Sequence, residues 1–267
     1  MPTAIVTGAS RGIGRGIALR LAEDGFDVVI NDIALQKTAL DEVATEIKST
    51  GKRALAVVGD VSKQDDVERI VDEAVIQYGQ LDVMVANAGI LDTTALLEMT
   101  VEKWDRVMAI NLRGVFLCYT IAARQMIKQG TKGKLIGACS ISGYRPSGKA
   151  PAYCTSKWGV RGLTQTAALE FGEYGISVNS YCPGSVKTDM STVFAERLGK
   201  DQAKEQDKDQ NKNNVDEVYR SSAHRKNALN KELFPSDIAG FVSFLASKDS
   251  SSITGQTMIC DGGMYFS

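Results

Sequence analysis

Short apolar runs alternate along the chain with longer segments in which apolar residues recur at helical spacing. The apolar runs predict strands at Thr3–Thr7, Asp27–Asn31, Ala54–Val58, Leu81–Ala86, Lys134–Cys139, Ser177–Tyr181 and Gln256–Cys260. The amphipathic segments predict helices near residues 12–24, 36–50, 63–78, 101–129, 152–174 and 236–246. This repeating order favours an α/β fold, a parallel sheet with helices on both faces. The continuously apolar strands are typical of a sheet that is covered on both sides.

One polar segment interrupts this pattern. The chain has 267 residues, which suits a single α/β domain with a sizeable core. Lys200–Asn214 carries balanced charges and hardly an apolar residue, whereas its flanks, Val193–Leu198 and Val215–Leu233, have apolar residues at helical spacing. We interpret 200–214 as an exposed insertion in preference to a functional lid, with flanks that fold over the edge of the sheet.

Composition excludes several classes of function. The 31 basic and 32 acidic residues nearly cancel, so nothing points to nucleic acid. The five cysteines are widely spaced and form no Cys-x-x-Cys pair, which favours reduced thiols in a cytoplasmic protein. We find no run of 18 apolar residues and no leader-like N-terminus, so we expect no membrane association. The single histidine, His224, argues against histidine acid–base chemistry and a histidine-rich metal site.

The first strand runs into a glycine-rich turn, Val6-Thr-Gly-Ala-Ser-Arg-Gly-Ile-Gly14. In such a turn Gly8 allows the tight bend, Gly12 lets the backbone approach a pyrophosphate, and Gly14 lets the helix pack on the strand. The N-terminus of the following helix then faces the negative phosphates. The turn therefore predicts a dinucleotide site, although a glycine-rich turn alone is often only a turn.

Two charged residues give opposite signals about the dinucleotide. Asp32, at the end of the second strand, can accept hydrogen bonds from the adenosine ribose hydroxyls and would repel a 2′-phosphate. A unit charge pair at 4 Å is worth about 4 kcal/mol at an effective dielectric of 20. Arg11 in the glycine turn could instead neutralise a 2′-phosphate. We predict NAD over NADP, while Asp32 could also merely cap the next helix. Asp60 and Val61 end the third strand, where an adenine would lie, and Asp60 could be only a cap before Ser62.

A second pattern supplies acid–base chemistry. Tyr153 and Lys157 stand four residues apart on a predicted helix, and therefore share one helix face. Reducing a ketone needs hydride on carbon and a proton on oxygen. A tyrosine can give that proton if its pKa of about 10 falls by roughly 2–3 units, equivalent to about 3–4 kcal/mol. A neighbouring ammonium favours the phenolate, and a hydroxyl such as that of Ser140 can hold the carbonyl oxygen.

Several motifs together resemble the classical short-chain dehydrogenases/reductases. They are Thr7-Gly-x-x-x-Gly-x-Gly14, Asn87-Ala-Gly89, Asn111, Ser140, Tyr153-x-x-x-Lys157 and Pro183-Gly184, and the match extends from Thr3 to Gly263. The resemblance implies a single-domain Rossmann fold with a doubly wound, seven-stranded parallel sheet, a substrate-loop insertion at about 189–234, and a homotetramer.

The resemblance also implies a role for each site residue. Ser140 would orient the carbonyl, Tyr153 would be the acid/base, and Asn111 would hold a water in a proton relay. Lys157 would bind the nicotinamide ribose and lower the pKa of Tyr153. The implied cofactor site comprises Gly8, Ser10, Arg11, Gly12, Ile13, Gly14, Asp32, Asp60, Val61, Asn87, Ala88, Gly89, Tyr153, Lys157, Pro183, Gly184, Val186 and Thr188. Within it, Pro183, Gly184 and Val186 would meet the nicotinamide, and Thr188 its carboxamide.

One branch of the family shares further segments with the chain. Ala138-Cys-Ser140, Arg161–Ala167 and Tyr181–Thr188 resemble acetoin (diacetyl) reductases, the meso-2,3-butanediol dehydrogenases, which act on small diketones and hydroxyketones with NAD(H). Two features depart from that branch, namely Arg11 and the longer, more polar segment 189–234. Ser142 could add a second polar contact to substrate, or could simply cap a turn before Gly143.

Other functions remain open from the sequence. The same catalytic groups could reduce a sugar, a polyol or a 3-oxoacyl substrate, with NADPH as a possible cofactor. A protein that senses NADH without turnover is expected to have lost Ser140, Tyr153 or Lys157, and all three are present. A lyase or epimerase could use the same fold, and net change in NADH would distinguish it.

Overall fold

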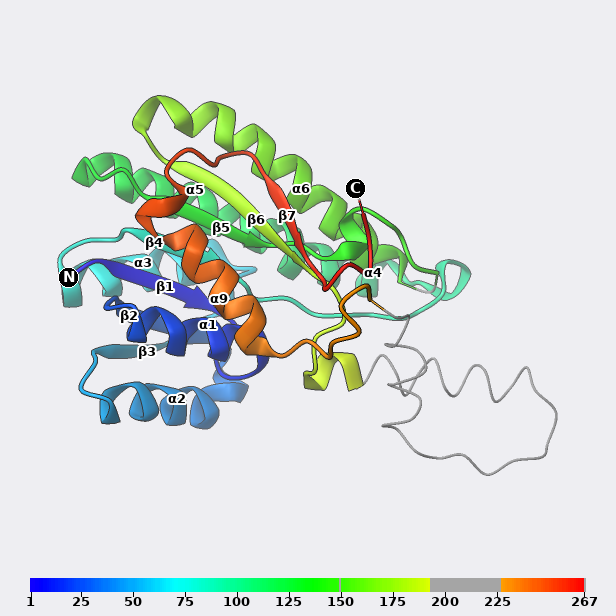
Figure 1. The fold of residues 1–267 in the computed structure, drawn as a ribbon, viewed down its shortest axis with the longest axis horizontal. Helices are drawn as coiled ribbons and strands as arrows, with labels where there is room; N and C mark the ends of the chain where they lie inside the picture. The colour runs from blue at the N-terminus through cyan, green and yellow to red at the C-terminus, as the bar shows by residue number, and fades with distance from the viewer. Residues whose placement is uncertain (149, 193–226, 267) are drawn as a thin grey trace.

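Seven parallel strands build one sheet within residues 1–148, 150–192 and 227–266, the part of the chain that this computed structural model describes. The strands are β1 (Thr3–Thr7), β2 (Asp27–Asp32), β3 (Ala54–Val58), β4 (Val83–Ala86), β5 (Lys134–Ala138), β6 (Ser177–Pro183) and β7 (Thr257–Cys260), in the spatial order β3-β2-β1-β4-β5-β6-β7 (Figure 1). All six strand pairs are parallel. The predicted fold class is confirmed, with strand ends that differ from the predicted ones by up to two residues.

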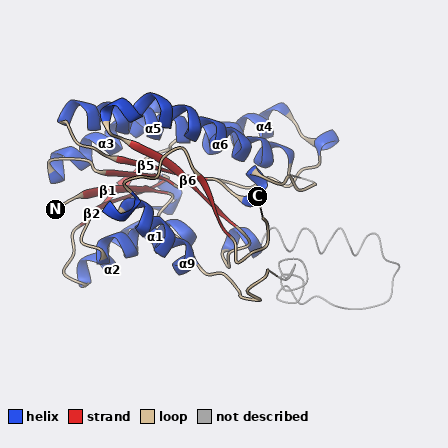
Figure 2. Ribbon diagram, turned by 45° about the horizontal axis from the view of Figure 1, so that its top comes forward, coloured by secondary structure: helices blue, strands red, loops and turns tan. Residues whose placement is uncertain are grey.

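Helices cover both faces of the sheet, as predicted (Figure 2). One face carries α1 (Gly12–Glu23), α2 (Lys37–Ser49) and α9 (Pro235–Ala246), and the other carries α3 (Gln64–Tyr78), α5 (Gly114–Gln129) and α6 (Pro151–Phe171). Each face has its own buried apolar cluster, with Ile17, Leu21 and Leu40 on the first and Ile70, Met84 and Met126 on the second. The hydrophobic effect therefore holds three layers together around one central sheet.

The predicted helix at 101–129 is interrupted near its middle. It consists of α4 (Val101–Met108), a π-helical turn (Ala109–Arg113) and α5, and the turn contains the fully buried Asn111. Among the described residues, Val101–Gln129 is also the one helical stretch that is long and apolar enough to cross a membrane, but 56% of its most apolar window is buried inside the protein. Burial against the sheet accounts for its apolar character.

The strand order places a crevice at the carboxyl ends of β1 and β4. Helices leave β1 and β4 towards opposite faces of the sheet, so the loops that follow these two strands diverge. The glycine turn follows β1, and Asn87-Ala-Gly89 follows β4. Because parallel strands end at the same edge, the motifs that are scattered along the sequence meet there.

Candidate active site

The glycine turn brings the backbone of β1 and α1 against the loop after β4. Gly8 and Gly12 have positive φ angles of 64° and 56°, a conformation that favours glycine. A Cβ on Gly14 would lie 2.1 Å from the carbonyl oxygen of Gly8, and one on Gly8 would lie 2.8 Å from Cα of Ala88. These approaches explain why glycine stands at each position, and they leave the amide groups at the N-terminus of α1 facing the crevice.

Asp32 is held at the opposite end of this turn by Ser10. The Oδ2 atom of Asp32 accepts hydrogen bonds from the Ser10 backbone N–H at 3.2 Å and from its hydroxyl at 2.6 Å, and Oδ1 accepts one from Ile33 N–H at 2.9 Å. An ionised carboxylate offers about four acceptor sites, so after these three hydrogen bonds capacity remains for one further donor, such as a ribose hydroxyl. Ser10 thus contributes by orienting Asp32.

Arg11 pairs with another carboxylate, that of Asp189. Its Nη1 atom lies 3.2 Å from Oδ2 of Asp189, which follows β6 and comes directly after Thr188. In the sequence, Asp32 favours NAD and Arg11 favours NADP. The pairing with Asp189 weakens the signal for NADP, because the guanidinium charge is already compensated.

A cleft of 480 Å³ joins most of the predicted cofactor residues. The predicted residues that line it are Gly8, Arg11, Gly12, Ile13, Gly14, Asp32, Asp60, Val61, Asn87, Ala88, Gly89, Tyr153, Lys157, Pro183 and Thr188. Val186 is buried and forms a β-bridge with Leu233, and Gly184 packs so closely on Asp261 that a Cβ would lie 2.7 Å from the Asp261 Cβ. Val186 and Gly184 therefore shape the loop after β6 from behind the cleft.

The end of β3 fits both interpretations of Asp60. Its Oδ1 atom accepts hydrogen bonds from the backbone N–H of Ser62 at 3.0 Å and from the Ser62 hydroxyl at 2.8 Å, as a turn-capping carboxylate does. Asp60 and Val61 also line the cleft beside Gly59. Asp60 therefore caps the turn and forms part of the cleft wall.

Tyr153 and Ser140, two of the predicted catalytic residues, are joined by a hydrogen bond. Tyr153 lies on α6, is half-buried, and makes a side-chain hydrogen bond with Ser140, which is the second residue after β5. Burial raises the pKa of the Tyr153 phenol to about 12, and the hydrogen bond to Ser140 only partly opposes this. We expected Lys157 to lower this pKa, whereas the protein's own groups raise it because desolvation is the larger effect. At neutral pH Tyr153 therefore carries its proton.

Lys157 is a buried cation beside this tyrosine. Its Nζ atom donates a hydrogen bond to the carbonyl oxygen of Ala138 at 2.8 Å and lies 5.5 Å from the centre of the Tyr153 ring. Burial lowers the pKa of the Lys157 ammonium to about 8, because the charged form is poorly solvated there. An ammonium has three donors, and because Lys157 lines the cleft the other two can be offered to a ligand.

Asn111 connects the π-helical turn to the loop after β4. Its Oδ1 atom accepts from Ile90 N–H at 2.8 Å, and its Nδ2 atom donates to the Ile90 carbonyl at 2.9 Å and to Ser156 Oγ at 3.2 Å. Both amide donors are therefore engaged. Asn111 fixes the loop that carries Gly89, and its role in a proton relay stays a prediction.

A short turn after β5 fixes the position of Ser140. Ser140 Oγ accepts a hydrogen bond from Ser142 N–H at 3.2 Å, and the Ser140 carbonyl accepts one from Gly143 N–H at 2.8 Å. A Cβ on Gly143 would lie 2.6 Å from the Cys139 sulfur and 2.9 Å from the Lys157 carbonyl oxygen. The Ser140 hydroxyl, rather than the Ser142 side chain, thus caps this turn, and a substrate contact of Ser142 stays a prediction.

Several residues of the cleft are missing from the sequence prediction. They are Asn31, Ile33, Gln36, Gly59, Ile90, Leu91, Arg106, Ile110, Ala138, Cys139, Tyr181, Asp189 and Met190. Most are immediate neighbours of predicted residues, so they could have been found by including the residues that flank the ends of the predicted strands. Tyr181 is different, because its hydroxyl donates to Asn87 Oδ1 at 2.7 Å across the sheet, and only the folded structure brings these two residues together.

The cleft fits a nicotinamide dinucleotide. It has helix N-terminal amides where a diphosphate would lie, a carboxylate at one end and a buried ammonium with free donors at the other. The predicted insertion residues 193–226, which include 200–214 and His224, lie outside the described residues.

The chain is similar to several known proteins. The family model for short chain dehydrogenases matches residues 2–199. The chain is 44% identical over 263 residues to a short-chain dehydrogenase/reductase from Armillaria gallica, covering 98% of this chain and 95% of that protein. It is 43% identical over 264 residues to a diacetyl reductase [(S)-acetoin forming] from Staphylococcus epidermidis, covering 99% and 98%.

Two further similarities complete the comparison. The chain is 40% identical over 263 residues to a 3-oxoacyl-[acyl-carrier-protein] reductase from Staphylococcus epidermidis, covering 98% of each protein. A crystal structure of a short-chain type dehydrogenase/reductase from Mycobacterium marinum superposes with a TM-score of 0.85 at 34% identity, covering 98% of this chain and 95% of that one.

Replacing Tyr153 with phenylalanine tests the acid. Tyr153→Phe keeps the ring and removes the phenolic proton, and positioned acid–base groups are worth roughly 10²–10⁴ in rate. We expect kcat to fall at least about 100-fold while the affinity for the dinucleotide, measured by fluorescence titration, stays within about twofold. A variant that keeps more than about a tenth of the wild-type kcat would remove Tyr153 from this role.

Proposed function

The chain belongs to the short-chain dehydrogenase/reductase family, oxidoreductases that act on alcohol and carbonyl groups with NAD(P), and we propose that it interconverts small ketones or diketones and secondary alcohols with NAD(H). The observation that carries the proposal is the pairing of Tyr153 with Ser140 beside the buried Lys157, at the edge of a dinucleotide-shaped cleft. The proposed substrates are of the diacetyl, acetoin and 2,3-butanediol type.

The chain's own groups would handle the proton of this reaction. The bound dinucleotide supplies or accepts the hydride. In the reductive direction Tyr153 gives its phenolic proton to the carbonyl oxygen, and Ser140 holds that oxygen by a hydrogen bond. Lys157 holds the ribose with its free donors and stabilises the phenolate that forms. In the oxidative direction the same tyrosine receives the proton of the alcohol.

The position of Asp32 supports NAD as the cofactor. Its carboxylate lies at the adenosine end of the cleft and is locked by three protein hydrogen bonds, two of them from Ser10. A 2′-phosphate would meet this negative charge. Arg11 is engaged with Asp189 and lies at another part of the cleft mouth.

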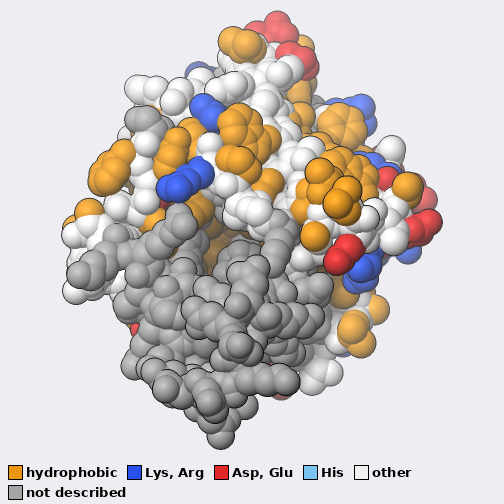
Figure 3. All heavy atoms as spheres, turned by 90° about the vertical axis from the view of Figure 1, so that its right-hand side faces the viewer, with side chains coloured by type: hydrophobic (Ala, Val, Ile, Leu, Met, Phe, Trp, Pro, Cys, Tyr) orange, Lys and Arg blue, Asp and Glu red, His pale blue; other side chains and the backbone are white. Residues whose placement is uncertain are grey.

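The surroundings of the cleft support an uncharged substrate. Figure 3 looks onto the carboxyl edge of the sheet, where hydrophobic side chains gather on the visible surface. The loops after β4, β6 and β7 expose Leu96, Leu97, Met190, Leu229 and Phe266. The similarity to a diacetyl reductase agrees with this surface. A 3-oxoacyl thioester is the second candidate, and a comparable similarity to a 3-oxoacyl reductase favours it.

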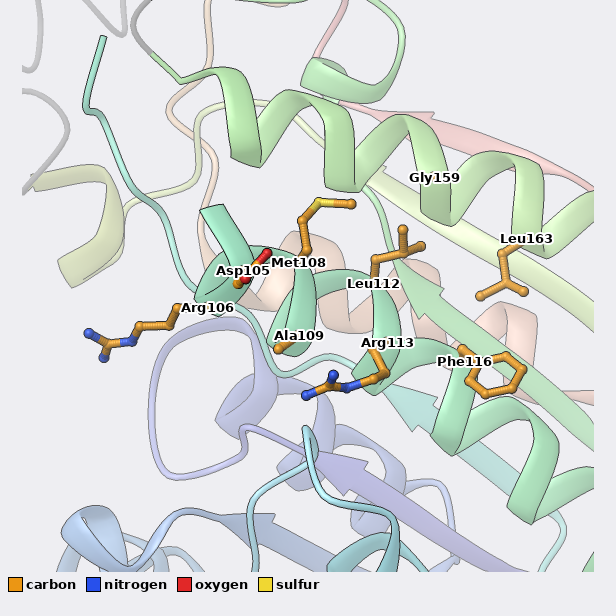
Figure 4. A pocket seen from close by; sticks show the side chains of 9 residues that line it. All are labelled: Asp105, Arg106, Met108, Ala109, Leu112, Arg113, Phe116, Gly159 and Leu163. Atoms are coloured by element: carbon orange, nitrogen blue, oxygen red, sulfur yellow. The ribbon is translucent and has the colours of Figure 1, made fainter. Parts of the chain in front are cut away.

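We also propose a homotetramer in the cytoplasm. A groove lies between α4, the π-helical turn, α5 and α6 (Figure 4). Leu112, Phe116 and Leu163 give it an apolar lining, and Arg106 and Arg113 flank it. Phe116 is 46% exposed although it lies on a core helix, which supports burial of this face by a second copy. Five free cysteines support a reducing compartment.

A substrate panel tests the proposed reaction. With NADH, we expect kcat/KM for diacetyl and acetoin to exceed that for 3-oxoacyl thioesters and ketosugars by at least about tenfold, equivalent to about 1.4 kcal/mol. NADH oxidation followed by absorbance provides the measurement. A preference for the thioester would replace the first candidate with the second, and no NADH oxidation with any carbonyl would overturn the proposal.

Cofactor choice is tested with Asp32→Ser. We expect wild type to prefer NADH over NADPH by at least about tenfold in kcat/KM, and the variant to lose or reverse this preference because the repelling carboxylate is gone. Asp60→Ser, at another carboxylate of the cleft wall, is the matched control and should keep the preference. Wild type that prefers NADPH would contradict our interpretation of Asp32.

The proposed assembly is tested by sedimentation velocity. Phe116→Glu should yield smaller species, because a buried unpaired carboxylate opposes association. Ile76→Glu replaces an exposed apolar residue on α3, 78% exposed, and should leave the tetramer intact. Monomeric wild-type protein at micromolar concentration would contradict the tetramer.

A further inference from the structure

An ion pair crosses the mouth of the cleft. Arg11 Nη1 lies 3.2 Å from Asp189 Oδ2, and the two side chains are 63% and 75% exposed. Both residues line the cleft, yet they are 178 positions apart in the chain. The pair therefore joins the glycine turn after β1 to the loop after β6, above the place where the diphosphate of a dinucleotide would lie.

Each side of the pair has a fixed backbone. Arg11 is the residue before α1, with extended φ and ψ of −158° and 177°, and its side chain makes no capping hydrogen bond. On the other side, the Thr188 carbonyl accepts hydrogen bonds from Ser191 N–H and Thr192 N–H, both at 3.1 Å. Asp189 thus lies at the start of a helical segment, described over 189–192, directly after Thr188, and both residues line the cleft.

The two sides approach closely beneath the pair. A Cβ on Gly12 would lie 3.5 Å from the Thr188 Cγ2 atom. A diphosphate bound at the N-terminus of α1 would therefore be enclosed between the glycine turn and the Thr188 turn, with Arg11 and Asp189 on its solvent side.

We propose that Arg11 and Asp189 form a clasp that slows release of the dinucleotide. The proposal rests on the proposed function, since it requires a dinucleotide in the cleft. Asp189 is a positioning residue that acts through Arg11. A guanidinium presents five N–H donors in a rigid fork, so Arg11 can keep its bond to Asp189 and direct other donors to a phosphate oxygen. Asp189 holds the fork across the cleft, and the guanidinium screens the carboxylate from the diphosphate.

An arginine in the first turn of α1 provides a matched control. Arg15 Nη2 pairs with Glu46 of α2 at 2.6 Å, with side chains 43% and 44% exposed. Arg15 is absent from the cleft lining, so its pair has similar chemistry four residues further along the chain but no contact with a bound diphosphate. Exposed pairs of this kind contribute little to folding stability, which makes folding defects in these variants small.

The test is the rate at which NADH leaves the protein. NADH-loaded wild type, Asp189→Asn, Arg11→Gln, the double variant and Arg15→Gln are mixed with excess NAD in a stopped-flow instrument, and the loss of bound-NADH fluorescence is followed. We expect Asp189→Asn to release NADH about two- to fivefold faster, the range that an exposed ion pair supports. Arg11→Gln should be at least as fast, and Arg15→Gln should match wild type.

Two further readouts separate the clasp from a general structural effect. The double variant should release NADH no faster than Arg11→Gln, because Asp189 acts only through that arginine. The difference between wild type and Asp189→Asn should shrink when ionic strength rises from about 0.05 to about 0.5 M, since salt screens the exposed pair. The thermal midpoint without nucleotide should be the same in Asp189→Asn and wild type.

The contrary outcomes are distinct. Unchanged release from Asp189→Asn would overturn the clasp. Slower release would overturn it too, because Asp189 would then compete with phosphate for Arg11, and additive effects in the double variant would show that Asp189 acts independently. Wild-type protein that binds no NADH would overturn the proposed cofactor itself, whereas NADH binding with unaltered release overturns the clasp alone.

Discussion

The buried ammonium group of Lys157 is the constraint on which the active site depends. Desolvation of a charge is costly, and the fall in the pKa of Lys157 to about 8 expresses that cost. The main compensation that the described residues offer is one carbonyl, that of Ala138 at the end of β5. The sheet, helix α6 and the turn after β5 must therefore keep their relative positions, because together they hold this cation at the cleft. A polyhydroxylated ligand could satisfy its remaining donors.

The other elements of the cleft complement this cation. Asp32, which Ser10 holds in place, puts a negative charge at the far end, and the N-terminus of α1 presents amide donors between the two. Along one cleft, the Asp32 carboxylate matches the first ribose of a dinucleotide, the amides at the N-terminus of α1 match its diphosphate, and the Lys157 ammonium matches its second ribose. Tyr153 stands beside the cation with its proton retained by burial, which suits a group that donates a proton during reduction.

Much of the fold could be predicted because local patterns decide it. Continuous apolar runs gave the parallel strands, and the spacing of Tyr153 and Lys157 placed both on one face of α6. The π-helical turn could not be predicted, since apolar periodicity continues through 101–129 while the cause of the turn, the pairing of Asn111 with Ile90, is a tertiary contact. The direction of Arg11 depends on Asp189 in a distant loop, and the raised pKa of Tyr153 depends on burial, so neither could be read from local sequence.

The pKa of Lys157 is the most direct test of this account. It can be measured by ¹³C NMR titration of protein carrying labelled lysine, with the Lys157 signal assigned by its loss in Lys157→Met. The account predicts a pKa near 8 for the protein without nucleotide, because burial penalises the charged form. A value at or above the ordinary lysine pKa of about 10.4 would show that the ammonium is solvated or paired with an acid, and would contradict the account.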